Sequence, residues 1–135
     1  METQMGLDYT VTTAEDSKRV LDLLAEKLKQ KGFGILSKID VQSVLKDKTG
    51  ADVGPYVILD VCKPDSAKKA IEAHPEIGMV LPCKILVRSE GKTTKVSLYR
   101  PTEMVVRAGF TDLAQLAREV EQDLKSVLEG VSATR

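Results

Sequence analysis

One stretch decides the fold: Pro55-Tyr56-Val57-Ile58-Leu59-Asp60-Val61-Cys62-Lys63-Pro64. Residues 56–62 are almost all apolar, which predicts a strand in the middle of a sheet, covered on both faces. Pro64 suits the first turn of a helix, because that position needs no backbone N–H donor. We therefore expect a central strand that leads directly into a helix over residues 64–74.

The next segments predict a hairpin beside this strand. Residues 80–88 and 94–100 have strand patterns, and Glu90-Gly91-Lys92 between them is typical of a tight turn. Because this hairpin is antiparallel, we favour an antiparallel partner for residues 56–62 as well, with helix 64–74 as an insertion. A parallel arrangement, with that helix as a crossover, is the alternative.

The beginning of the chain predicts a strand and a long helix. Residues 7–11 alternate apolar and polar side chains, as in a short strand. Thr12 and Glu15 have the spacing of a capping box. We therefore expect the first helix to begin at Thr12 and to extend to about Lys31.

Three further segments complete the pattern. A strand is expected over residues 34–40, and a short helix over residues 41–48 with Asp40 as its N-cap. Pro101 is expected to end the last strand. The longest helix, over about residues 110–128, carries a one-sided apolar stripe that must pack on the sheet.

Together these elements predict a single domain over residues 1–135 of the α+β class. The order predicts a two-layer fold, in which a mostly antiparallel five-stranded sheet carries two long helices on one face, with two short inserted helices. A chain of 135 residues is long enough to bury its own core without metal or disulfide staples.

Composition excludes several function classes. The 20 basic and 20 acidic side chains give a formal net charge of zero, so no positive field attracts nucleic acid or an anionic membrane. No stretch approaches the ~20 apolar residues of a membrane span, and the N-terminus lacks signal-peptide features. We expect a cytoplasmic protein without a permanent disulfide.

The chemistry of the chain concentrates at two cysteines, Cys62 and Cys83. Each marks a strand end, has a proline within two residues, and is followed by a lysine, Lys63 or Lys84. A neighbouring cation favours the thiolate, which is the nucleophile and metal ligand of cysteine chemistry. If the central strands are antiparallel, both cysteines lie at the same sheet edge.

Strand parity supports a different interpretation of the cysteines. Cys83 shares a face with Ile85 and Val87, whereas Cys62 shares parity with Ile58 and not with the buried set. Buried free cysteine is also common, since it behaves as a small apolar side chain. The two thiols can therefore be a functional pair or simply packing residues.

His74 is the only histidine and the only obvious third ligand for a metal ion. It lies twelve residues from Cys62 across a helix, or roughly 15–18 Å at 1.5 Å per residue. The two side chains therefore cannot bind one metal ion within a monomer. A site made by Cys62 and Cys83 would need a ligand from a second subunit, or a soft ion such as Cu(I).

The middle of the chain resembles a known family over roughly residues 30–100. The segments that carry the resemblance are Gly32-Phe33-Gly34, Ile39-Asp40-Val41, Pro55-Tyr56, Ile58-Leu59, Cys62-x-Pro64, Ala67-x-x-Ala70 and Ile77-Gly78-x-x-Leu81-Pro82-Cys83. They are similar to those of the bacterial and archaeal domain-of-unknown-function family three hundred and two. The resemblance implies a TATA-binding-protein-like topology and a homodimer, with no assigned activity. Members commonly carry asparagine where this chain has Lys63 and Lys84.

These observations predict a binding protein without catalysis. We expect a pocket for a small ligand or a soft metal ion, zinc or copper, lined by Cys62, Pro64, Tyr56, Pro82 and Cys83. One alternative is a thiol-redox protein in which Cys62 and Cys83 form and break a disulfide. Another is an interaction protein whose cysteines only pack. The first or last helix, or an edge strand, is expected to supply the homodimer interface.

Overall fold

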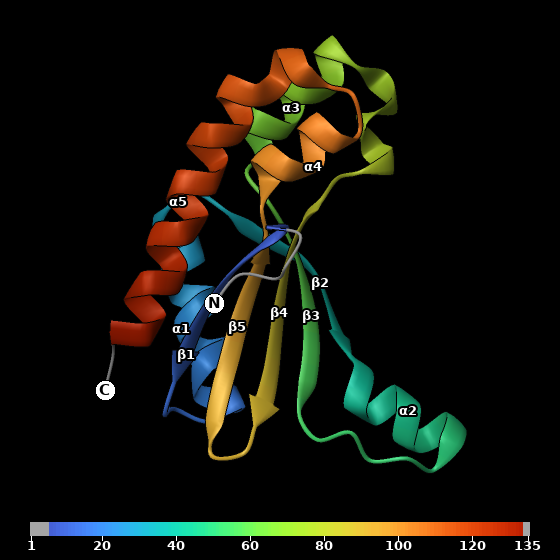
Figure 1. Ribbon diagram of the computed structural model, residues 1–135, viewed down its shortest axis with the longest axis vertical. Helices are drawn as coiled ribbons and strands as arrows, with labels where there is room; N and C mark the ends of the chain where they lie inside the picture. The colour runs from blue at the N-terminus through green and yellow to red at the C-terminus, as the bar shows by residue number, and fades with distance from the viewer. Residues whose placement is uncertain (1–5, 134–135) are drawn as a thin grey trace.

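A computed structural model describes residues 6–133, and Figure 1 shows their arrangement. Five strands form one sheet in the order β1-β5-β4-β3-β2, and every neighbouring pair is antiparallel. The strands are β1 (Asp8–Thr13), β2 (Gly34–Asp40), β3 (Tyr56–Cys62), β4 (Cys83–Glu90) and β5 (Thr93–Tyr99). The predicted α+β class is confirmed.

The pairing of β3 with β4 is the antiparallel one. Tyr56 lies opposite Arg88, and Val61 lies opposite Cys83, so the end of β3 and the start of β4 meet at one edge of the sheet. Residues 63–82 therefore form an insertion above this edge. The parallel alternative is excluded.

One face of the sheet is covered by the two long helices, α1 (Ser17–Gln30) and α5 (Ala114–Ala133). Figure 1 shows α1 behind the strands and α5 along the side of the sheet that carries β1. The buried helix residues pack against the inward residues of the strands. The main core contains Val20, Leu24, Leu28, Leu59, Val61, Ile85, Val87, Val96, Leu98, Leu124 and Leu128.

The opposite face of β3 has no such cover, so the prediction of a strand buried on both faces was wrong. Val57, Leu59 and Val61 are buried, whereas Ile58 and Asp60, which point the other way, are half-buried. The reason is that both long helices pack on the same face. Packing in the core therefore explains the apolar residues Val57, Leu59 and Val61 of β3, but it does not explain Ile58.

A second apolar cluster lies beyond the edge where β3 ends and β4 begins. It is built from α3 (Pro64–Ala73), η1 (Pro75–Met79), α4 (Pro101–Arg107), η2 (Thr111–Leu113) and the start of α5. Its buried members are Ala70, Ile77, Met104, Val105, Leu113 and Ala117. Figure 1 shows these helices gathered at one end of the sheet.

The remaining helix, α2 (Val41–Thr49), extends from the end of β2 and contains no buried residue. As predicted, Asp40 is its N-cap and accepts a hydrogen bond from the Ser43 N–H at 3.1 Å. Gly50 closes it in the left-handed conformation at φ 78°. No helix within residues 6–133 is long and apolar enough to cross a membrane.

Two predicted boundaries were wrong. Thr12 does not cap the first helix, because β1 continues through Thr13 in register with β5, and Asp16 caps α1 instead. The fourth strand begins at Cys83, not at residue 80. Pro82 has no backbone N–H to pair, and the N–H groups of Val80 and Leu81 donate to the Ile77 carbonyl of η1 instead of to a strand.

Pro101 does end β5, but it also begins α4, a helix that the sequence analysis missed. Pro101 occupies the first helical turn, where its fixed φ is favourable. Met104 and Val105 then follow at i+3 and i+4, which is the helical spacing of a buried face. This pattern was the signal available in the sequence.

Glu121 connects α4 to α5. Its carboxylate accepts hydrogen bonds from the Thr102 N–H at 3.0 Å and from the Thr102 hydroxyl at 2.7 Å, and it pairs with Arg100 at 3.2 Å. Burial opposes its charged form, but the hydrogen bonds from Thr102 and the charge of Arg100 outweigh burial, so the pKa of Glu121 lies below its usual value.

We predict that Glu121→Gln lowers the free energy of unfolding at pH 7 by about 1–3 kcal/mol, because a buried charged acceptor is lost. A carboxyl whose folded pKa is lowered stabilises above its unfolded pKa and loses that contribution as the pH falls. The difference between wild type and variant should therefore shrink below about pH 5. Urea unfolding at several pH values measures it, with exposed Glu119→Gln as control. A pH-independent difference would contradict this role.

Candidate functional site

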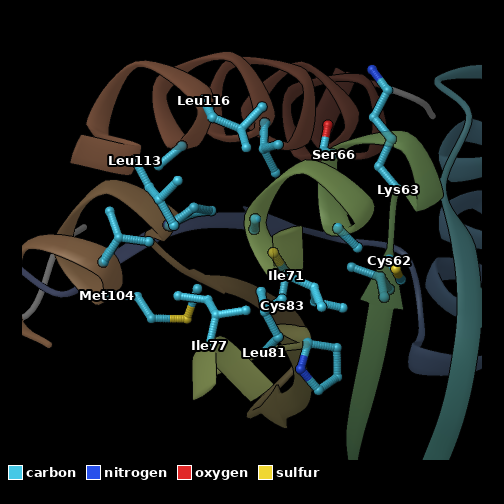
Figure 2. Close-up of a pocket in the computed structure, with 18 of the residues that line it drawn as sticks. Cys62, Lys63, Ser66, Ile71, Ile77, Leu81, Cys83, Met104, Leu113 and Leu116 are labelled. Atoms are coloured by element: carbon cyan, nitrogen blue, oxygen red, sulfur yellow. The ribbon is translucent and has the colours of Figure 1, made fainter. Parts of the chain in front are cut away.

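An apolar pocket of about 250 Å³ lies within the second cluster, at the end of β3 and β4 (Figure 2). Helix α3 and η1 form one side, whereas α4, η2 and α5 form the other. The lining residues from the first side and the sheet are Leu36, Val61, Cys62, Lys63, Ser66, Ala67, Ala70, Ile71, Ile77, Leu81, Pro82 and Cys83. Those from the second side are Pro101, Met104, Val105, Leu113, Leu116, Ala117 and Val120.

The pocket runs from the buried interior to an open mouth. Val61 and Ile77 at its base are fully buried, whereas Leu36 and Ile71 are 64% and 48% exposed and mark the opening. Apart from the two thiols, only Lys63 and Ser66 bring polar side-chain atoms to the lining. The pocket therefore suits apolar matter far better than charge.

Three of the predicted site residues line this pocket, and two do not. Cys62, Pro82 and Cys83 belong to the lining. Pro64 occupies the first turn of α3, is exposed, and is not in the lining. Tyr56 begins β3 at its opposite end, about 20 Å away at ~3.3 Å per residue. The structure therefore brings Cys62, Pro82 and Cys83 together at one edge of the sheet, and it places Pro64 and Tyr56 outside this pocket.

The structure brings the two cysteines to one pocket from opposite faces of the sheet. Because Val61 pairs directly with Cys83, those two side chains share the core face, and Cys62 points to the other. Cys83 is buried, Cys62 is half-buried, and both are free thiols. The parity derived from the sequence is confirmed.

Burial controls the ionisation of both thiols. It raises the pKa of the Cys62 thiol. The pKa of Cys83 is raised to about 12 by burial and, secondarily, by the neighbouring Cys62. The thiolate is the reactive and metal-binding form, so burial disfavours the reactive form of both side chains.

The two lysines that follow the cysteines do not activate them, contrary to the sequence-based expectation. The Lys63 ammonium pairs with Asp123 at 2.9 Å and lies 5.6 Å from the centre of the Phe33 ring. The Lys84 ammonium pairs with Asp60 at 3.0 Å, on the face of the sheet opposite the core. Each positive charge is therefore directed to a carboxylate.

His74 is engaged away from the cysteines. Its Nε2 lies 2.8 Å from Asp112 and its Nδ1 lies 3.4 Å from Glu76, while its ring packs against Phe110. These contacts tie the end of α3 to η2. Within residues 6–133, no three His, Cys, Asp or Glu side chains gather as metal ligands would. The geometry gives no support to a zinc or copper site at Cys62 and Cys83.

The sequence analysis missed the far wall of the pocket. Met104 and Val105 come from α4, which was not predicted, and Leu113 comes from the 3₁₀ turn that precedes α5. Leu116 projects from α5 into the pocket (Figure 2). The apolar stripe predicted over residues 110–128 was expected to pack on the sheet, but the start of α5 packs in the second cluster, beyond the sheet edge.

The fold and site together define a class: an α+β protein with an apolar pocket at one end of an antiparallel sheet. The chain belongs to the family described as "Domain of unknown function DUF302", whose model matches residues 9–131. The crystal structure of an uncharacterized conserved DUF302 protein from Bacillus stearothermophilus is similar, with 33% sequence identity and a TM-score of 0.86. The match covers 91% of this chain and 96% of that one. None of the curated proteins matches this chain.

We predict that both thiols react slowly in the folded protein. At pH 7, Cys62 should be alkylated by iodoacetamide more slowly than free cysteine, and Cys83 only after unfolding, because burial raises both pKa values. Lys63→Ala and Lys84→Ala should not slow the reaction at Cys62. Mass spectrometry of timed samples measures both rates.

Mild oxidation followed by mass spectrometry gives the result that would contradict this prediction. If both thiols disappear and each chain loses two hydrogen atoms, Cys62 and Cys83 form a disulfide and the packing interpretation is wrong.

Proposed function

We propose that this protein is a non-catalytic binding module for a small, mostly apolar molecule held in the pocket between α3, α4 and α5. The observation that carries the proposal is the pocket itself: a preformed cavity of about 250 Å³ with an almost wholly apolar lining and an open mouth. Such pockets are the usual location of small-molecule sites.

The volume limits the size of the ligand. A cavity of about 150 Å³ can accept benzene, and ligand pockets commonly begin near about 300 Å³. A pocket of about 250 Å³ lies between these values. The ligand is therefore of the size of a two-ring aromatic molecule or a short alkyl chain.

The free-energy cost of leaving this apolar pocket empty also favours a bound ligand. Wall atoms that face a void or water lack the packing contacts of a filled core, and apolar surface left exposed to water is unfavourable. The mouth lowers the cost by admitting water, but apolar walls bind water poorly. An apolar ligand would restore the lost packing contacts.

The polar groups at the rim set the ligand's polarity. The Lys63 ammonium is already paired with Asp123, so it does not favour a charged ligand. The Ser66 hydroxyl and the Cys62 thiol can each make one weak or neutral hydrogen bond. These groups suit a neutral ligand with no more than one or two polar atoms, placed near the start of α3.

The two alternatives based on cysteine chemistry have less support. A soft-metal site needs thiolates and a third ligand, and a redox pair needs thiols that meet. Cys62 and Cys83 are protonated and point to opposite faces of the sheet. We therefore assign them as walls of the pocket. Their sulfur atoms contribute polarizable apolar surface.

A cavity-filling variant tests the proposal. Ala70 is buried on the pocket side of α3, and Ala73 lies on the exposed side of the same helix. We predict that naphthalene at about ten times its Kd raises the Tm of the wild type by about 3–6 °C. Ala70→Phe should abolish this shift because the new ring occupies the cavity. Ala73→Phe, the matched control, should retain it.

Native mass spectrometry of the purified protein provides the second readout, because a retained small molecule adds mass to the wild type and not to Ala70→Phe. The proposal fails if naphthalene and octanol both leave the wild-type Tm unchanged, or if Ala70→Phe and Ala73→Phe respond alike.

A further inference from the structure

The second apolar cluster is divided into two blocks, and the pocket lies between them. In the first block α3 lies close to η1, and in the second block α4, η2 and α5 lie close to one another. Ile71 of the first block and Leu113 of the second line the same cavity (Figure 2). The separation of the two blocks therefore sets the width of the pocket.

The first block is joined to the sheet through two neighbouring strand ends. The chain enters the block after Cys62 of β3 and leaves it at Cys83 of β4, and Val61 lies directly opposite Cys83. Helix α3 then spans 10 residues, which is about 15 Å at 1.5 Å per residue. His74 follows the last residue of α3, so it lies far from the end of β3.

A polar contact joins the two blocks near each end of α3. Before the helix, the Lys63 ammonium pairs with Asp123 of α5 at 2.9 Å. After the helix, Nε2 of His74 lies 2.8 Å from Asp112 of η2. Histidine changes its charge between about pH 5 and 8, and His74 is the only histidine of the chain. The contact at the end far from β3 therefore responds to pH.

Two carboxylates and one aromatic ring lie against the imidazole of His74. Asp112 on η2 faces Nε2, and Glu76 on η1 lies 3.4 Å from Nδ1. The Phe110 ring packs against the imidazole, with 4.9 Å between the ring centroids. Since a carboxylate only accepts hydrogen bonds, the neutral imidazole carries its proton on Nε2 and donates it to Asp112. Nδ1 then faces Glu76 without a proton to donate.

Protonation of His74 improves both contacts. The imidazolium donates a charge-assisted hydrogen bond to Asp112, which is stronger than a hydrogen bond from the neutral ring. Nδ1 gains the proton that its contact with Glu76 lacks. A positive charge between two carboxylates therefore strengthens the link between the end of α3 and η2.

We propose that the His74–Asp112 contact is a pH-sensitive latch on the pocket, which holds α3 against η2 more tightly when His74 is protonated. The inference rests on the proposed function, because the pocket that the latch controls is the proposed ligand site. Lowering the pH holds the two blocks together and slows the exchange of an apolar ligand. Raising the pH loosens the end of α3 that is far from β3. Opening of such lids controls ligand entry and release.

Methyl NMR of naphthalene exchange at pH 5.5 and pH 8 tests the latch. The dissociation rate of naphthalene from the wild type should be about two- to fivefold lower at pH 5.5, the range expected for a partly exposed ion pair. His74→Gln and Asp112→Asn should each remove this pH dependence, because neither variant forms the charged pair. Asp47→Asn on exposed α2 is the matched control and should keep it.

Hydrogen exchange without ligand separates this inference from the proposed function. If the wild type binds no naphthalene, the proposed function fails, and amide exchange in residues 68–73 of α3 then tests the latch. Protection of these amides, corrected for the intrinsic exchange rate at each pH, should be about two- to fivefold greater at pH 5.5 than at pH 8. In His74→Gln this protection should not depend on pH, and protected core amides such as that of Leu24 should show that the variant folds. A wild type without pH dependence, or a His74→Gln variant with the same dependence, overturns the proposal.

Discussion

The antiparallel pairing of β3 with β4 is the constraint on which the rest of the structure depends. Because Val61 lies opposite Cys83, the twenty residues between Cys62 and Cys83 must leave and re-enter the sheet at one edge. They do so as α3 and η1, which form a cap over that edge. The cap cannot bury its apolar side on the sheet alone, and α4 with the start of α5 closes the other side. The pocket is the space left between these two walls.

Burial explains why the pocket favours binding over chemistry. The same apolar surroundings that would hold a hydrophobic ligand raise the pKa of both thiols, so they remain protonated. The lysines next to them are paired with Asp123 and Asp60 and do not offset this effect. Cysteines at strand ends with basic neighbours are therefore insufficient evidence for a reactive pair. The direction of each side chain and the partners of each cation decide the outcome.

Much of this fold could be predicted from the sequence, because strand alternation and the helical stripe of α5 are local signals. Strand parity also predicted that Cys62 and Cys83 point to different faces. Other features depended on tertiary pairing. Thr12 has a capping sequence, but pairing with β5 keeps it in β1. The far wall of the pocket depends on α4, whose short length gives a weak pattern. Tyr56 lies outside the pocket, since sharing a strand with Cys62 does not imply sharing a site.

The most direct test of an apolar binding pocket is methyl NMR of the wild-type protein titrated with naphthalene. We predict saturable shifts for methyl groups that line the pocket, such as those of Met104, Ile77 and Leu113. Methyl groups of the main core, such as those of Leu24 and Val96, should remain unshifted. Shifts spread equally over both clusters, or no shift in the lining, would contradict the assignment of this pocket as the binding site.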